Sequence, residues 1–127
     1  MKKGLVVLIM FSIFNIFSKA QVNPEKELSI DDFIKEMKNN KSLVIVDVRT
    51  PEELVGPLGK IDGVINIPVQ EITSRFNELS KYKDKEIAVI CRTGNRSTFG
   101  TDFLISKGYK AKNVLGGMVK YRQKISK

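Results

Sequence analysis

The residues with the clearest chemical potential form the segment Cys91-Arg92-Thr93-Gly94-Asn95-Arg96-Ser97. Cys91 is the one cysteine of the sequence, and the sequence contains no histidine. A thiol is a weak nucleophile until it loses its proton, and the histidine of a Cys-His pair is not available here to take that proton. The groups that remain to stabilise a thiolate are the backbone N–H groups of the segment, the N-terminus of a following helix, and Arg92 and Arg96. The sequence therefore predicts a reactive sulfur held by backbone amides and arginines.

This segment connects a predicted strand to a predicted helix. The apolar run 87–90 precedes it, and helical spacing of apolar residues over 97–107, followed by Gly108, comes after it. A tight turn between a strand and a helix lets backbone N–H groups converge on one point, and Gly94 permits the required twist. One cysteine without histidine makes a zinc site implausible, so we expect neither a metal nor an organic cofactor.

The rest of the chain alternates between helical and extended patterns. Predicted helices start after Ser29 and after Thr50, and others cover 69–79, 97–107 and, after the turn 116–117, 118–125; predicted strands cover 43–46, 64–67, 87–90 and 111–115. Continuous β-branched runs such as 43–46 are typical of strands that are buried on both faces of a parallel sheet. The pattern predicts one α/β domain with a mostly parallel sheet of four to five strands and helices on both faces.

Charged residues follow one of the predicted strands. Asp47-Val48-Arg49 comes directly after the strand 43–46, as Cys91 does after the strand 87–90. Sites in parallel sheets form at the carboxyl ends of the strands, so we expect Asp47, Arg49 and Cys91 at one edge. A charged pair at a strand end is more often structural than reactive.

The first 20 residues have the pattern of a secretory signal peptide. Lys2 and Lys3 precede the apolar run 5–17, and 18–20 is a small-x-small cleavage signal. The run is shorter than the about 20 residues of a spanning helix, although an uncleaved N-terminal anchor stays an alternative. We expect a signal peptide over 1–20, a polar extended leader over 21–27 and the domain over 28–127. The protein would then be exported, to the periplasm or the extracellular space, with no stable membrane insertion after cleavage.

The charge of the chain narrows the choice of partners. The formal net charge is +8, but the basic residues are scattered and form no stripe interleaved with aromatic side chains. Nucleic-acid binding is therefore not expected, whereas the positive charge suits a small anionic substrate or an acidic partner. We expect a monomer.

Four stretches together resemble the single-domain rhodaneses, the thiosulfate sulfurtransferase family. They are Asp47-Val48-Arg49, the stretch 63–68 with Gly-Val-Ile-Asn-Ile-Pro, the loop 91–97 and Gly116-Gly117-Met118. The resemblance implies a three-layer rhodanese-like domain. It also implies that Cys91 takes a sulfane sulfur from an anionic donor such as thiosulfate, holds it as a persulfide, and passes it to cyanide, a thiol or a protein acceptor.

The resemblance also implies roles for the other residues. Backbone N–H groups of the loop would hold the anionic sulfur, Arg92 and Arg96 would bind the donor, and Asp47 and Arg49 would support the site. The substrate-binding set is Arg92, Thr93, Gly94, Asn95, Arg96 and Ser97.

Three departures from the family pattern concern the rim of the site and the packing. Lys60 stands where a histidine is common, and the stretch 54–59 is longer by a residue or two. Tyr121 stands where an indole is common, which we interpret as a packing change.

Other interpretations of the cysteine loop stay open. Phosphatases and arsenate reductases place five residues between the cysteine and the arginine, whereas Cys91 and Arg96 enclose only the four residues from Arg92 to Asn95. A non-catalytic binding module or a thiol or persulfide sensor is a second alternative, because an exposed thiol of low pKa is easily oxidised. An inert buried thiol is the third, although the neighbouring arginines and Gly94 disfavour it.

Overall fold

The centre of the molecule is a five-stranded parallel sheet. The computed structural model describes residues 21–126; the predicted signal peptide lies outside the described residues. The sheet has the order β1-β5-β4-β2-β3, and all neighbouring strands are parallel. The strands are β1 (Glu27–Leu28), β2 (Val44–Asp47), β3 (Ile65–Asn66), β4 (Glu86–Ile90) and β5 (Lys110–Val114). The predicted parallel sheet is confirmed, but β1 was not predicted and begins inside the expected leader.

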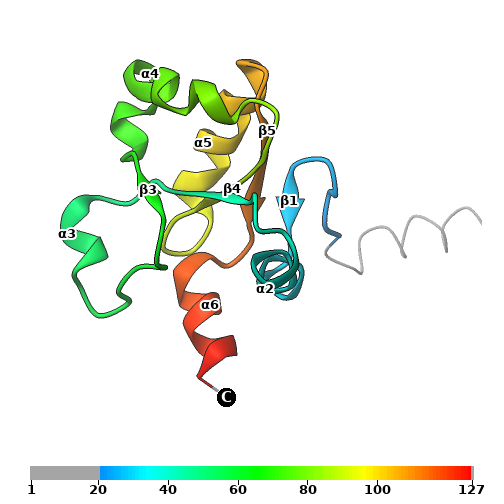
Figure 1. Ribbon diagram of the computed structural model, residues 1–127. Coiled ribbons are helices and arrows are strands. Elements are labelled where there is room, and N and C mark those ends of the chain that lie inside the picture. The colour runs from blue at the N-terminus through cyan, green and yellow to red at the C-terminus, as the bar shows by residue number, and fades with distance from the viewer. Residues whose placement is uncertain (1–20, 127) are drawn as a thin grey trace, which may run out of the picture.

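Helices cover both faces of this sheet. The helices are α2 (Ile30–Asn39), α3 (Pro51–Leu54), α4 (Ile72–Arg75), α5 (Asn95–Ser106) and α6 (Gly117–Ile125), with 3₁₀ turns η1 (Val69–Glu71) and η2 (Phe76–Tyr82). Figure 1 shows α4 and α5 on one side of the sheet and α2 and α6 on the other, which confirms the expected three-layer α/β arrangement. No helix within residues 21–126 is both long and apolar enough to span a bilayer.

Two helix starts follow the signals in the sequence. The Ser29 hydroxyl accepts the Asp32 N–H at 3.1 Å and caps α2. Thr50 caps α3, with Pro51 in the first turn, and the Glu53 carboxylate accepts a hydrogen bond from the Thr50 N–H at 3.1 Å. These reciprocal bonds form a capping box, which satisfies backbone donors that a helix start otherwise leaves free.

The predicted helix over 69–79 is wrong in detail. The chain forms η1, the single turn α4 and then η2 in its place. Phe76, Leu79 and Tyr82 recur at every third residue, and all three pack on the same core cluster. A 3₁₀ helix has three residues per turn and keeps such a stripe on one face, whereas an α-helix would rotate it away. The Tyr109 hydroxyl also donates to the Phe76 carbonyl oxygen at 3.1 Å.

The central strand β4 divides the core in two. Ile87 and Val89 belong to the cluster beneath α4 and α5, whereas Ala88 and Ile90 belong to the cluster beneath α2 and α6. Successive side chains of a strand point to opposite faces, so the residue after Ile90 belongs with Ile87 and Val89. Cys91 is that residue, and it lies in the same cluster.

Candidate active site

Cys91 lies at the carboxyl end of β4 and is almost fully enclosed. The residue is 1% exposed, so the expectation of an exposed thiol is wrong. Its sulfur is nevertheless hydrogen-bonded: the Gly94 N–H donates to Sγ at 3.1 Å, and the Ser97 Oγ lies 3.2 Å from Sγ. Gly94 has a φ of +106°, a left-handed conformation that glycine adopts without strain. Cys91 is therefore buried but placed among polar groups of its own loop.

These polar groups favour the ionised sulfur. Burial raises the pKa of the Cys91 thiol, but hydrogen bonds from the Ser97 side chain and from the backbone N–H groups of Ser97, Gly94 and Thr93 lower it by more. The net result is a pKa below the ordinary value of a cysteine. Since the thiolate is the reactive form, the loop increases the fraction of Cys91 that can act as a nucleophile.

The N-terminus of α6 is hydrogen-bonded to backbone carbonyl groups of the cysteine loop. The Met118 N–H donates to the Cys91 carbonyl oxygen at 2.8 Å, and the Val119 N–H donates to the Arg92 carbonyl oxygen at 3.0 Å. This approach requires glycine at position 117, where a Cβ would lie 2.5 Å from the Cys91 oxygen and 2.6 Å from the Arg92 oxygen. Free N–H groups at a helix start thus fix the carbonyls of the loop while its own N–H groups turn towards the sulfur.

Asp47 and Arg49 lie at the same edge of the sheet and form a buried ion pair. Their nearest charged atoms are 2.8 Å apart, and both side chains are at most 1% exposed. Arg49 also donates to the carbonyl oxygens of Glu53 and Gly59, at 3.3 and 2.8 Å. The Asn66 amide donates to the backbone oxygens of Asp47 and Arg49, which joins β3 to this edge. The pair therefore connects the strand to the loop after α3, and its supporting role in catalysis stays a prediction.

Arg96 is paired with a residue that the sequence analysis did not select. Its guanidinium donates to both carboxylate oxygens of Glu53, at 2.6 and 2.8 Å. The hydrogen bond from Arg96 is the main reason why the pKa of Glu53 falls from 4.5 to about 2, and Glu53 raises the pKa of Arg96 in turn. A cation in the first turn of a helix opposes the helix dipole, and the Glu53 carboxylate compensates that charge. The role of Arg96 in donor binding stays a prediction.

Arg92 differs from Arg96 in its surroundings. It is exposed and forms no ion pair within residues 21–126. Its side chain borders a cavity of about 470 Å³ beside the cysteine loop; the lining residues are Arg49, Glu52, Glu53, Gly56, Pro57, Leu58 and Arg92. Arg92 is therefore the loop arginine whose charge is available to an anion.

The loop between α3 and β3, which forms one wall of this cavity, is held by an arginine from α6. Arg122 donates to the Leu58 carbonyl oxygen at 2.7 Å and to the Lys60 carbonyl oxygen at 3.2 Å. Tyr121, its neighbour, packs edge-on against Phe33 with ring centroids 6.0 Å apart, and its interpretation as a packing change stays a prediction. The rim around Lys60 is thus fixed through backbone oxygens rather than through a side chain of the rim itself.

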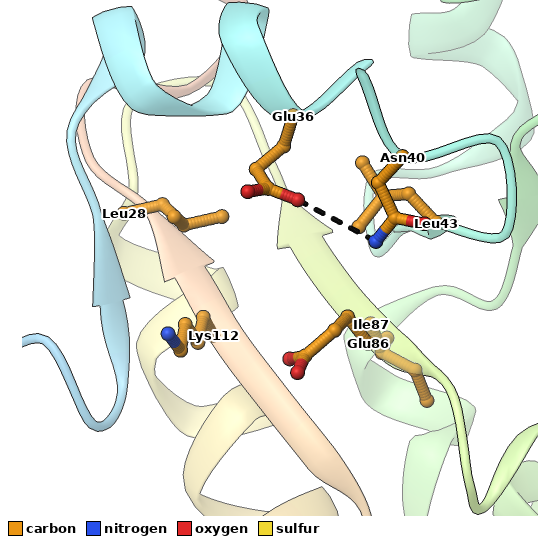
Figure 2. A pocket seen from close by; sticks show the side chains of 7 residues that line it. All are labelled: Leu28, Glu36, Asn40, Leu43, Glu86, Ile87 and Lys112. Atoms are coloured by element: carbon orange, nitrogen blue, oxygen red, sulfur yellow. Dashed lines mark hydrogen bonds between the residues drawn. The ribbon is translucent and has the colours of Figure 1, made fainter. Parts of the chain in front are cut away.

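A separate cavity of about 270 Å³ lies on the α2 side of the sheet, and Figure 2 shows its lining. Glu36 and Asn40 of α2 face it from one side, joined by a hydrogen bond of 3.4 Å, and Glu86 and Lys112 face it from the strands. None of the predicted site residues lines this cavity. The chemistry of the cysteine loop is therefore not connected to it.

The structure brings the predicted residues together at one edge of the sheet and adds two more. Glu53 had a signal in the sequence as the fourth residue of a capping box, but nothing local indicated its bond to Arg96. Asn113, a buried residue of β5, accepts a hydrogen bond from the Ser97 hydroxyl at 2.5 Å. It had no signal, because the strand pattern gives no information about side chains from another loop.

The fold and the site define an α/β domain with a cysteine, hydrogen-bonded by its own loop, at the carboxyl edge of a parallel sheet. A family model described as Rhodanese-like domain matches residues 29–124. A rhodanese-related protein of Thermoplasma volcanium has a similar solved structure, with a TM-score of 0.69, 32% identity, and coverage of 78% of this chain and 92% of that one. The chain belongs to the rhodanese-like family.

Two curated relatives from Bacillus subtilis have names that refer to sulfur. The chain is 34% identical over 94 residues to the putative sulfurtransferase YtwF, covering 74% of this chain and 87% of the relative. It is 37% identical over 93 residues to the putative sulfur carrier protein YrkF, covering 72% of this chain and 48% of the relative. The chain thus spans about half the length of this second relative.

Proposed function

We propose that this protein is a sulfurtransferase that carries sulfane sulfur on Cys91. The observation that carries the proposal is the enclosure of the Cys91 sulfur by hydrogen-bond donors of its own loop, with the Gly94 N–H at 3.1 Å. Such a site stabilises a small anionic sulfur, either a thiolate or a persulfide. The names of the relatives, a sulfurtransferase and a sulfur carrier, support the same chemistry.

The reaction has two steps at the same sulfur. The Cys91 thiolate attacks the outer sulfur of thiosulfate, the S–S bond of the donor breaks, and sulfite leaves with the electron pair. The product is a Cys91 persulfide whose outer sulfur carries the negative charge. A thiolate or cyanide then attacks that outer sulfur, the persulfide bond breaks, and the Cys91 thiolate is restored. No net oxidation or reduction occurs, and no proton is required for either displacement.

The two arginines contribute differently to these steps. Arg92 is exposed beside the cavity and free of an ion pair within residues 21–126, so it attracts the anionic donor and the departing sulfite. Arg96 is engaged by Glu53 and holds the first turn of α5 in place, which keeps the loop amides directed at the sulfur. The acceptor, a small thiol or a protein thiol, approaches the same edge. We also propose that the protein acts after export, as the pattern of residues 1–20 predicts.

Intact-protein mass spectrometry tests the proposal directly. Incubation with thiosulfate should add about 32 Da to Cys91, and cyanide should remove it; sulfinic acid adds a similar mass but is not removed by cyanide. The Cys91→Ser variant should keep its fold and gain no mass. If no cyanide-sensitive sulfur forms while the thiol oxidises readily, a sensor or a binding module replaces the transferase as the function.

A further inference from the structure

Asn113 connects β5 to the back of the cysteine loop. Its Oδ1 accepts the Ser97 hydroxyl at 2.5 Å, and its amide donates to the Gly94 carbonyl oxygen at 3.2 Å and to the Thr98 hydroxyl at 3.1 Å. Asn113 is 5% exposed and Ser97 is fully buried. Within residues 21–126, no hydrogen bond joins Asn113 directly to the Cys91 sulfur, and the Ser97 hydroxyl is hydrogen-bonded to both.

The Ser97 hydroxyl has one proton and two acceptors that need it. A serine hydroxyl can donate one hydrogen bond, yet the Cys91 Sγ lies 3.2 Å away on one side and the Asn113 Oδ1 lies 2.5 Å away on the other. When Cys91 is a neutral thiol, it donates to Ser97 and Ser97 donates to Asn113, so all three groups are satisfied. When Cys91 is a thiolate, the Gly94 N–H still donates to it, but the Ser97 hydroxyl can donate only to the sulfur or to the buried Asn113 oxygen. One of these two acceptors then loses the Ser97 hydrogen bond, which costs free energy.

The persulfide removes this conflict. Its charge lies on the outer sulfur, which extends away from Sγ by one S–S bond of about 2.05 Å, and Sγ itself becomes a neutral bridging atom. Ser97 can then donate to Asn113 without depriving an anion of its proton. The competition for the Ser97 hydroxyl therefore favours the neutral thiol and the persulfide over the empty thiolate, and it offsets part of the stabilisation that the loop N–H groups give the thiolate.

We propose that Asn113 is a positioning residue that competes with Cys91 for the Ser97 hydroxyl and so shifts the balance from the empty thiolate towards the loaded persulfide. The part of this inference that concerns the persulfide rests on the proposed function. The part that concerns the thiolate does not, because the competition exists in the protein without any sulfur donor.

The charged groups around this network are few and mostly paired. On the Cys91 side they are Arg92, the Arg96–Glu53 pair, the Asp47–Arg49 pair and Lys120, whose side chain lies against Gly116; on the Asn113 side they are Lys26, Glu27 and Asp102, which line a small cavity with Asn113. None of them is altered by a substitution at Asn113. A change in the titration of Cys91 in such a variant therefore reports on the hydrogen bonds.

The first test is the pKa of Cys91, measured from the pH dependence of its reaction with iodoacetamide and from thiolate absorbance, without any sulfur donor. Asn113→Ala should lower this pKa by about 1, because the freed Ser97 hydroxyl then donates fully to the thiolate. Thr101→Val is the matched control: the Thr101 hydroxyl lies beside the same small cavity and has no hydrogen-bond partner within residues 21–126. Its removal should leave the pKa unchanged.

A double-mutant cycle shows whether Asn113 acts through Ser97. Ser97→Ala alone should raise the pKa of Cys91, and adding Asn113→Ala in that background should change it no further. An unchanged or raised pKa in Asn113→Ala, or a decrease of the same size with and without Ser97, overturns the proposal. If Asn113→Ala does not fold, Asn113→Val, which introduces a strand-favouring side chain, carries the same expectations.

The loaded form provides a second readout. At a pH above the pKa of Cys91, the ratio of persulfide to thiolate in a mixture of thiosulfate and sulfite should fall about tenfold in Asn113→Ala. If the wild-type protein forms no persulfide but Asn113→Ala still lowers the pKa through Ser97, the proposed function fails and the competition for the hydroxyl stands. If the wild-type protein loads sulfur and the cycle shows no coupling, the inference fails and the proposed function stands.

Discussion

The contact between α6 and the cysteine loop makes a sharp prediction about Gly117. A Cβ at this position would lie 2.5 Å from the Cys91 oxygen and 2.6 Å from the Arg92 oxygen, and both are backbone atoms that cannot turn aside as a side chain would. Gly117→Ala must therefore move either the start of α6 or the loop. Either movement weakens the hydrogen bonds from the Met118 and Val119 N–H groups to those two oxygens.

The expected magnitude follows from three contributions. Gly117 has a φ of +56°, and an alanine in that conformation costs about 1–2 kcal/mol. Overpacking adds about 1–3 kcal/mol, and weakening two backbone hydrogen bonds adds about 1 kcal/mol or more. Gly63 provides the control, because its φ is +84° and a Cβ there would have no atom within 4 Å. We expect about 3–6 kcal/mol of destabilisation for Gly117→Ala and about 1–2 kcal/mol for Gly63→Ala.

Urea unfolding of the two variants measures this difference, and the rate of persulfide formation measures its effect on the site. Gly117→Ala should also load sulfur at least about tenfold more slowly than Gly63→Ala, because small displacements of a reacting group are costly. Equal stability losses in the two variants would refute the reasoning, since the conformational strain would then account for the whole effect. A destabilised Gly117→Ala with an unchanged loading rate would show that the loop keeps its shape without α6.

Two further predictions concern ion pairs. The pKa of Glu53 is lowered from 4.5 to about 2 by Arg96, so its carboxylate stabilises the fold above pH 4.5 and loses this effect as the pH falls towards 2. Glu53→Gln should therefore cost about 1–2 kcal/mol at pH 7, after allowance for solvent screening, and progressively less below pH 4.5 by urea unfolding; a loss that is constant with pH would count against this account. Asp47→Asn leaves the buried Arg49 charge uncompensated and should cost about 3–5 kcal/mol, against at most about 1 for the exposed Asp102→Asn. Comparable losses of stability in these two variants would show that the buried ion pair stabilises the fold no more than an exposed one.

The sequence alone predicted those structural features that depend on residues close together in the chain. Capping residues located the starts of α2 and α3 because a helix N-terminus needs specific side-chain acceptors. The β-branched runs indicated a parallel sheet, and in such a sheet Asp47 and Cys91 necessarily reach the same edge. Burial of Cys91 was not foreseen, because the polar residues that follow it gave no sign that its own side chain continues the buried face of β4.

Features that depend on distant parts of the chain were not predictable in this way. The strand β1 has only two residues and no apolar run, and it exists because its backbone pairs with β5. Glu53 bonds to a residue 43 positions away, Asn113 to one 16 away and Arg122 to one 64 away. Each of these side chains is an ordinary polar residue in its own segment, and only the assembled fold gives it a partner.

The enclosure of the Cys91 sulfur has a consequence for what the protein shows to its surroundings. In the proposed sulfurtransferase, the enclosed thiol of the unloaded protein is shielded from bulky disulfides, whereas a donor that ends in a single sulfur atom can reach it with that atom. A loaded carrier presents one extra atom, about 2 Å further out, which is the cargo itself. An acceptor thiol would therefore react with the loaded form, whose outer sulfur is accessible, and would make no bond when it collides with the unloaded form.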